Sequence, residues 1–269
     1  MSSSKRLIVG LFVEGSRPTD PLRDDFASMW KLLGSHCGHQ TELRVFGISK
    51  GHVIRLESVP VQPRATQLIK GQRQLVGSGE PLDIAIQRAH EKEKLDRVII
   101  AFDRWRANQL LTLEEQKLAC PMRPEVAFVL GRLATSNHLD GIFRDAARTL
   151  LARYESRETL VPRAGNCGTL EVLFMDPMFE ALFTSDQATV RRALGVEKKK
   201  PKDWPKFKTH EPELDKAVLD VAVWAATGKR VGYTSAKARW GHVFVKAATA
   251  DAAIWRHPIA VRLCRAMAA

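Results

Sequence analysis

Leu-Asp-Arg-Val-Ile-Ile-Ala-Phe-Asp-Arg-Trp-Arg, residues 95–106, is the stretch of sequence that decides the fold class of this chain. Its centre, Val98 to Phe102, is a continuous apolar run without alternation, which indicates a strand buried on both faces of a parallel sheet. The run ends at Asp103, and the chain then turns basic. Open α/β sheets bind ligands outside the carboxyl ends of their strands, so Asp103 is a candidate site residue.

A second stretch has the same form near the start of the chain. Leu7 to Val13 is an apolar run that ends at Glu14, and Gly15 follows, a residue that lets the chain turn. If this strand lies next to the one that ends at Asp103, the two carboxylates meet at one edge of the sheet.

Helical and strand patterns alternate along the first part of the chain. Residues 18–34 carry apolar side chains at helical spacing, and 42–48 are β-branched enough for a strand. Residues 53–79 contain several Pro and Gly, which predicts a loop with at most short strands. Helices are predicted from Pro81 and over 139–154. This order predicts an α/β fold with a mainly parallel sheet flanked by helices.

The second part of the chain is predicted to be helical and basic. Residues 170–177 are expected to open a helical stretch, and a proline-containing lid or linker follows at 198–212. Residues 214–267 predict further helices. We therefore divide the chain into an α/β domain at 1–185 and a basic α-helical C-terminal region at 186–269 that packs on it.

Composition and apolar run length argue for a soluble protein. The chain is 45% hydrophobic and 27% charged, as in ordinary globular domains. Its longest apolar runs are far shorter than the roughly 20 residues that a membrane span needs. The apolar run at 7–13 is also short for a signal peptide. We expect a cytoplasmic protein without membrane contact.

The four cysteines predict neither a zinc site nor a disulfide framework. Cys37, Cys120, Cys167 and Cys264 are widely scattered, and no pair has the Cys-x-x-Cys spacing. The segment His36-Cys37-Gly38-His39 matches no closed four-ligand zinc site. Reduced thiols are the expectation.

The net charge of +12 lies mainly in the last third of the chain. Residues 186–269 contain 17 Lys and Arg against 8 Asp and Glu. Such an excess attracts polyanions, and Trp204, Trp224, Trp240 and Trp255 among these charges could stack on bases. Nucleic acid is the expected partner. A solvated basic face and four core tryptophans are the alternative.

The two strand ends and a later motif together resemble a known family. The motifs are Leu-Ile-Val-Gly-Leu-Phe-Val-Glu-Gly at 7–15, Asp-Arg-Val-Ile-Ile-Ala-Phe-Asp at 96–103 and Leu-Glu-Val-Leu-Phe-Met-Asp-Pro at 170–177. They resemble the Toprim-like proteins of the domain of unknown function 4276 family, which are similar to the Toprim half of overcoming-lysogenisation-defect nucleases. The resemblance implies a Toprim-like, Rossmannoid sheet.

The resemblance also implies a metal site. Glu14 matches the family's first-strand glutamate, and Asp103 matches its first aspartate. In the family these acids bind Mg²⁺ or Mn²⁺, so Glu14 and Asp103 are the candidate metal ligands and catalytic residues. Glu171 and Asp176 match a later Glu-x-x-x-x-Asp helix that would support the metal. Lys206 matches a Pro-Lys element of the same relatives.

One position departs from the family's Asp-x-Asp motif, because Trp105 stands where the second aspartate is expected. An indole cannot ligate a hard cation, so either another acid (Glu171, Asp176, Asp20 or Asp24) completes the site, or the site binds metal poorly or not at all. Arg104 and Arg106 oppose a cation and could instead clamp a phosphate. Lys198, Lys199, Lys200 and Lys206, together with these two arginines, are the candidate nucleic-acid-binding residues.

Three hypotheses on function follow. The first is a magnesium-dependent nuclease, or nuclease-like subunit, that acts on DNA or RNA. The resemblance implies a role in bacterial anti-phage defence or genome maintenance beside an ATPase or another defence-complex subunit. The second is a catalytically degenerate scaffold or sensor subunit with the same fold. The third is a basic structural protein without a site. The sequence leaves the oligomeric state open.

Overall fold

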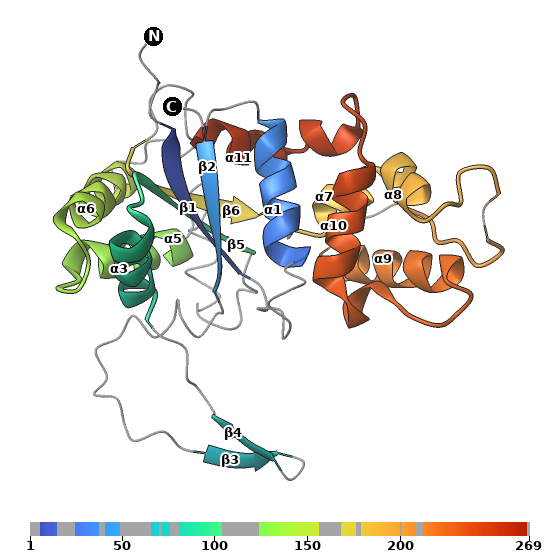
Figure 1. The fold of residues 1–269 in the computed structure, drawn as a ribbon, viewed down its shortest axis with the longest axis horizontal. Coiled ribbons are helices and arrows are strands. Elements are labelled where there is room, and N and C mark those ends of the chain that lie inside the picture. Colours follow the sequence, from blue (N-terminus) through green and yellow to red (C-terminus); the bar gives the residue numbers. More distant parts are fainter. Residues whose placement is uncertain are drawn as a thin grey trace.

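A four-stranded, all-parallel sheet forms the centre of the molecule in a computed structural model of the chain (Figure 1). The structure describes residues 6–14, 25–37, 41–48, 66–69, 72–75, 81–103, 124–155, 168–175, 179–199, 201–207 and 212–267. The strand order is β2 (Thr41–Ile48), β1 (Leu7–Glu14), β5 (Arg97–Asp103) and β6 (Leu170–Met175).

The two strands predicted from apolar runs are the central pair of this sheet. β1 pairs in parallel with β5, with Val13 opposite Ala101. Side chains of alternate residues point to opposite faces, and Leu11 and Phe12 of β1 are both buried, as are Ile99 and Ile100 of β5. The prediction of two strands buried on both faces is confirmed, and the structure shows that they are neighbours.

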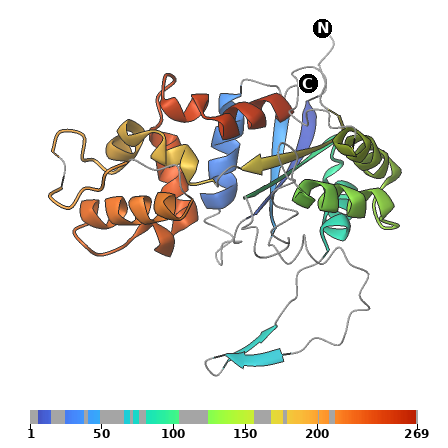
Figure 2. The same ribbon diagram turned by 180° about the vertical axis from the view of Figure 1, so that it is seen from behind.

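Helices cover both faces of the sheet (Figures 1 and 2). On one face, an apolar cluster joins the strands to α3 (Leu82–Glu93), α5 (Pro124–Thr135) and α6 (Gly141–Glu155). On the other face, a second cluster joins them to α1 (Asp25–His36) and α11 (Pro258–Met267). The predicted α/β architecture with a parallel sheet flanked by helices is confirmed.

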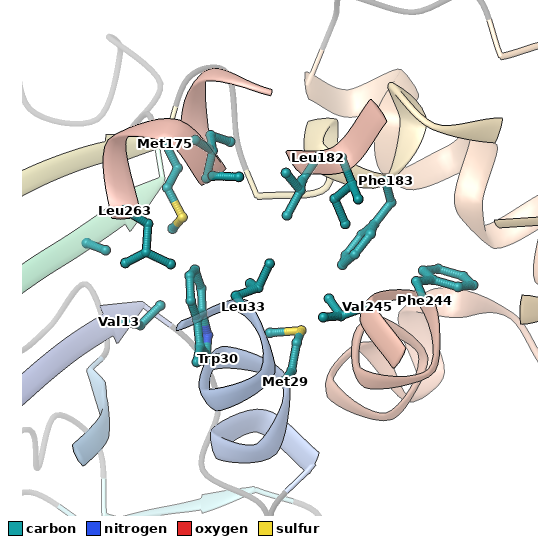
Figure 3. Packing of buried hydrophobic residues seen from close by; sticks show 14 of the residues in the cluster. Val13, Met29, Trp30, Leu33, Met175, Leu182, Phe183, Phe244, Val245 and Leu263 are labelled. Carbon is teal, nitrogen blue, oxygen red and sulfur yellow. The ribbon is translucent and has the colours of Figure 1, made fainter. Parts of the chain in front are cut away.

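The C-terminal part of the chain is helical, as predicted, and lies beside α1 in Figure 1. It contains α7 (Ala181–Thr184), α8 (Gln187–Ala193), α9 (Pro212–Ala226) and α10 (Lys237–Ala247), with 3-10 turns η2 (Tyr233–Ser235) and η3 (Ala253–Arg256). Figure 3 shows how Trp30 and Leu33 of α1 pack with Leu263 of α11, Phe183 of α7 and Val245 of α10. These helices and the sheet thus share one apolar cluster.

A buried aspartate fixes the chain where the C-terminal region was predicted to begin. Asp186 caps α8, because its carboxylate accepts the Thr189 backbone N–H at 3.0 Å and the Thr189 hydroxyl at 2.8 Å. It also accepts the backbone N–H of Ile254 in η3 at 3.2 Å. The segment that follows α7 is therefore anchored to the end of the chain, while the proposed division at residue 185 stays a prediction.

Two short strands lie outside the main sheet. β3 (Thr66–Ile69) and β4 (Gln72–Leu75) pair with each other in antiparallel orientation. They fall in the glycine- and proline-containing stretch at 53–79 for which at most short strands were expected, and they agree with that prediction; the other residues of this stretch lie outside the described part.

The predicted helical stretch at residues 170–177 is wrong over its first six residues. Leu170 to Met175 form β6, which pairs in parallel with β5, and Leu170 and Leu173 are buried on opposite faces. Six residues make fewer than two helical turns, whereas as a strand they satisfy their backbone groups along β5. Tertiary pairing therefore decides this segment.

The expectation of reduced thiols is wrong for two cysteines. Cys37, after the end of α1, forms a disulfide with Cys264 of α11, and their Cα atoms are 4.9 Å apart. Cys120 and Cys167 lie outside the described residues. Disulfides persist mainly in oxidising compartments, so this bond does not favour the cytoplasmic location expected from the sequence. Within the described ranges, no helix is both long and apolar enough to span a membrane.

We predict that replacing Cys264 by Ser lowers the free energy of unfolding by about 2–5 kcal/mol, because the disulfide spans 227 residues of the unfolded chain. Urea titrations of the oxidised wild type and the variant measure the difference. A dithiol reductant should bring the wild type to the variant's stability. A wild type that is equally stable with and without the reductant would contradict the prediction.

Candidate functional site

The two predicted acids stand at the carboxyl ends of adjacent parallel strands. β1 ends at Glu14, one residue beyond the pair Val13–Ala101, and β5 ends at Asp103, two residues beyond it. Strand spacing and rise place the two Cα atoms about 6 Å apart. The structure thus brings the two backbone positions together at one edge of the sheet, while their side chains lie outside the described part.

Glu171 lies near the opposite edge of the sheet. It is the second residue of β6 and pairs with Ile99, whereas Met175 at the end of β6 pairs with Asp103. Four residues of strand separate these pairs, a distance of about 13 Å along the sheet. The register therefore does not bring Glu171 to the edge where Glu14 and Asp103 lie.

Glu171 belongs instead to a buried polar group at the amino edge. Its side chain is buried, and its Oε1 accepts the backbone N–H of Gly168 at 3.0 Å. Burial raises the pKa of Glu171 above its ordinary value, against the smaller opposing effects of the Gly168 hydrogen bond, Arg97 and Arg153. Arg97 is also buried, and its Nη1 donates to the backbone carbonyl of Ala266 in α11 at 3.0 Å.

The other predicted site residues fall into two groups. Lys198, Lys199 and Lys206 are exposed on the segment between α8 and α9, as surface phosphate contacts would need to be. Four positions lie outside the described residues: Arg104, Arg106, Asp176 and Lys200. Their assigned roles stay predictions.

Two polar pairs that the sequence analysis missed lie toward the carboxyl edge. Asp25 opens α1, the helix that follows β1, and its Oδ1 lies 3.2 Å from Nδ1 of His242 in α10. Glu180 comes five residues after the end of β6, and its Oε1 lies 3.7 Å from the Lys237 ammonium. Glu180 is only 4% exposed. Its Oε2 has no hydrogen-bond partner within the described part of the chain, so the hydrogen-bonding capacity of this buried carboxylate is only partly satisfied.

No local pattern would have identified these pairs, because their members are 217 and 57 residues apart in the sequence. Asp25 was visible only as an acid about a dozen residues after the predicted strand at 7–13, and Glu180 only as an acid after a stretch predicted to be helical. Their partners come from α10, whose docking beside α1 depends on tertiary packing (Figure 3).

A small apolar gap lies under the same edge, between the sheet and the helices α1 and α11. It is lined by Trp30, Ala101, Leu173, Met175, Ile259, Arg262 and Leu263. It has room for about one water molecule. This gap is therefore too small to take a nucleotide.

The described side chains form no complete metal centre. Among them, no group of three or more His, Cys, Asp or Glu residues could hold a metal ion. The side chains of Glu14, Asp103 and Asp176 lie outside that part of the structure. The predicted Mg²⁺ site therefore rests on backbone positions and on the chemistry of carboxylate ligands, which suit a hard cation.

We predict that Glu171→Gln stabilises the protein increasingly as the pH rises from 4 to 8. Because the pKa of Glu171 is raised in the folded state, its stabilising protonated form is fully present below the ordinary value of 4.5 and is lost as the pH rises through the folded pKa. Glutamine keeps the size and the acceptor for Gly168 but does not ionise. Urea titrations at several pH values measure the difference, and a constant difference would contradict the prediction.

Comparison with known proteins identifies no relative of this chain. Protein-family models, curated proteins and solved structures were each searched, and no match to this chain was found.

Proposed function

We propose that the chain is a Toprim-like, metal-dependent nuclease that acts on DNA or RNA. The observation that carries the proposal is the pairing of β1 with β5, which places Glu14 and Asp103 at one edge of a parallel sheet. Ligand sites of open α/β sheets lie at this edge. Residues 186–269 contain 17 Lys and Arg but only 8 Asp and Glu, and this positive charge supports a polyanionic substrate.

Glu14 and Asp103 would hold Mg²⁺ or Mn²⁺, since such ions take oxygen ligands and need only one or two carboxylates. Asp176 directly follows Met175, the residue that pairs with Asp103, and is the best-placed third acid. When bound, the ion would offset the charge that develops on the phosphate. Glu14 would also serve as the general base for the attacking water. Glu171 is too far along β6 to share this ion.

Basic side chains near the carboxyl edge would orient the substrate. Arg104 and Arg106 follow β5 directly and would bind the phosphate next to the scissile bond. Lys237 pairs with Glu180 close to the same edge. The exposed Lys198, Lys199 and Lys206, together with Lys200, would contact the backbone farther away.

The resemblance to Toprim-like proteins extends the proposal to the cell. It suggests a bacterial anti-phage or genome-maintenance system in which an ATPase or another subunit acts beside this chain. A cytoplasmic location would suit that role, although the Cys37–Cys264 disulfide speaks against it.

A scaffold or sensor subunit is the second candidate, and Trp105 is the observation that favours it. Trp105 replaces the second aspartate of the family's Asp-x-Asp motif, which removes one of three expected negative charges. A site that has lost this charge holds a divalent ion less tightly, and Arg104 and Arg106 weaken it further. The chain would then bind nucleic acid without cutting it.

We predict that Glu14→Gln reduces cleavage of a plasmid or RNA in Mg²⁺ or Mn²⁺ by at least about 100-fold, because it removes both a ligand and the base. Glu42→Gln is the matched control, since Glu42 is a partly exposed glutamate at the start of β2, on the opposite edge of the sheet. Gel electrophoresis of the products measures the rate. Equal cleavage by the wild type and Glu14→Gln would exclude this catalytic site, and the scaffold hypothesis would then stand.

We predict that replacing Lys198, Lys199 and Lys200 by Ala weakens nucleic-acid binding similarly for different sequences. Each phosphate contact contributes about 0.7–0.9 to the slope of log affinity against log salt, so losing three contacts should flatten the slope by about 2–3. A filter-binding series over salt concentration measures it. Lys92→Ala is the control, because Lys92 is exposed on α3. An unchanged slope in the triple variant would remove these lysines from the interface.

A further inference from the structure

Trp224 is set apart from the other tryptophans by its exposure. Trp30 is buried, and Trp204, Trp240 and Trp255 are half-buried against the larger apolar cluster. Trp224, near the end of α9, is 37% exposed. Among the tryptophans that the structure describes, it is the one whose indole has a large surface open to solvent.

Two exposed valines lie on α9 and on the turn that follows it, on the same stretch of chain as Trp224. Val221 precedes it by three residues on α9, so the two side chains are neighbours on the helix surface, and Val221 is 41% exposed. Val231, 43% exposed, lies on the chain that turns back along α9. That turn is fixed by a hydrogen bond from the Lys229 N–H to the Trp224 carbonyl at 2.8 Å and by one from the Thr227 hydroxyl to the Val231 carbonyl at 3.0 Å.

Cationic side chains lie beside Trp224 and along the chain that follows it. The Lys229 ammonium lies 4.9 Å from the centre of the Trp224 ring, a cation–π contact, and Arg230 beside it is exposed. Between Asp220 and Asp251 the chain carries five basic residues and no acidic one; they are Lys229, Arg230, Lys237, Arg239 and Lys246. We name Val221, Trp224, Lys229, Arg230 and Val231 the Trp224 platform.

The lysine segment between α8 and α9 approaches the platform. Lys229 lies 3.5 Å from the carboxylate of Asp203, which ties this segment to the turn after α9. Lys202 and Lys206, on either side of Asp203, are exposed. The platform therefore has a positively charged margin on the side of Asp203.

We propose that the Trp224 platform binds single-stranded nucleic acid by stacking a base on the Trp224 indole, an inference that rests on the proposed function because it specifies that substrate. Every unpaired base offers a flat face to an aromatic ring, whereas the bases of a duplex are already stacked on each other. Lys229 and Arg230 meet the phosphates on either side. A second copy of this chain is a poor occupant, because two surfaces rich in Lys and Arg repel each other.

The platform is connected to the carboxyl edge of the sheet by a short, fixed stretch of chain. Asp220 of α9 accepts hydrogen bonds from the Thr234 backbone N–H at 2.8 Å and from the Thr234 hydroxyl at 2.6 Å. Lys237, three residues later, pairs with Glu180 near the edge. In Figures 1 and 2, α9 lies on the same lower side of the molecule as the carboxyl ends of β1 and β2, with α1 and α10 between α9 and the sheet. A strand that is held at Trp224 and follows this stretch past Lys237 would approach the carboxyl edge.

Binding without metal tests the platform separately from cleavage. Fluorescence anisotropy in EDTA would compare labelled 20-nucleotide single strands, DNA and RNA, with a duplex of the same length. Trp224→Ala should weaken single-strand binding by about 5- to 150-fold, the loss of one stacked base, and duplex binding by less than about threefold. Trp224→Phe, which keeps an aromatic face, should stay within a few-fold of the wild type.

Two matched controls separate stacking and charge from general surface effects. Ile142→Ala removes another exposed apolar side chain, on α6, and should leave binding unchanged. Lys229→Glu should weaken single-strand binding by more than Lys92→Glu, which reverses an exposed charge on α3. Circular dichroism melting verifies that each variant is folded.

The outcomes distinguish this proposal from the nuclease proposal. Equal single-strand binding by the wild type, Trp224→Ala and Ile142→Ala in EDTA would overturn the platform, even if Glu14→Gln abolished cleavage. Equal losses for single strand and duplex would also overturn it. Selective loss of single-strand binding in Trp224→Ala would support the platform, even if the wild type cut nothing.

Discussion

The parallel pairing of β1 with both β2 and β5 is the constraint on which the rest of the structure depends. β1 is paired along its whole length with β2 and over five residues with β5, and its side chains are buried on both faces. Parallel neighbours require a crossover, which places helices on the two faces of the sheet. The same pairing directs the carboxyl ends of all four strands to one edge, where loops can collect functional groups.

The two edges of the sheet differ in chemical character. At the amino edge, Glu171 and Arg97 are buried, and Arg97 binds the carbonyl of Ala266 at the end of α11. Such a group fixes α11 on the sheet and is inaccessible to a large substrate. Toward the carboxyl edge, Asp25, His242 and Lys237 remain between about a quarter and a half exposed. The molecule therefore has buried polar groups at the amino edge and solvent-accessible polar groups toward the carboxyl edge.

Much of the fold could be predicted from the sequence, because apolar runs and helical spacing are local signals. β1, β5 and α6 were each predicted at nearly their observed bounds and α3 at its start, whereas the adjacency of β1 and β5 was a condition that only the structure settles. β6 was misjudged, since a six-residue run with a glutamate at its second position has no decisive period. Only the partner strand and the burial of Glu171 beside Gly168 and Arg97 explain its conformation.

Features made by distant residues could not be predicted in the same way. The disulfide joins Cys37 to Cys264, and the Asp25–His242 pair joins α1 to α10. The partners are so far apart in the sequence that no local motif marks either pair. The exposure of Trp224 was equally hidden, because four tryptophans share the basic region and only packing separates the exposed one from the other three. The placement of Glu14 and Asp103 at one edge could be predicted, because the carboxyl ends of parallel strands lie at the same edge of a sheet.

The hydrogen bond from Arg97 to Ala266 has a consequence for attachment. It holds the end of α11 beside the start of β5, and β1 also begins at that edge, so Leu7 and Met267 lie at the amino end of the sheet (Figure 1). A tag, linker or fused module joined before Leu7 or after Met267 would leave the body on this side. Immobilised through either attachment, the protein would turn its carboxyl edge outward, toward the solution.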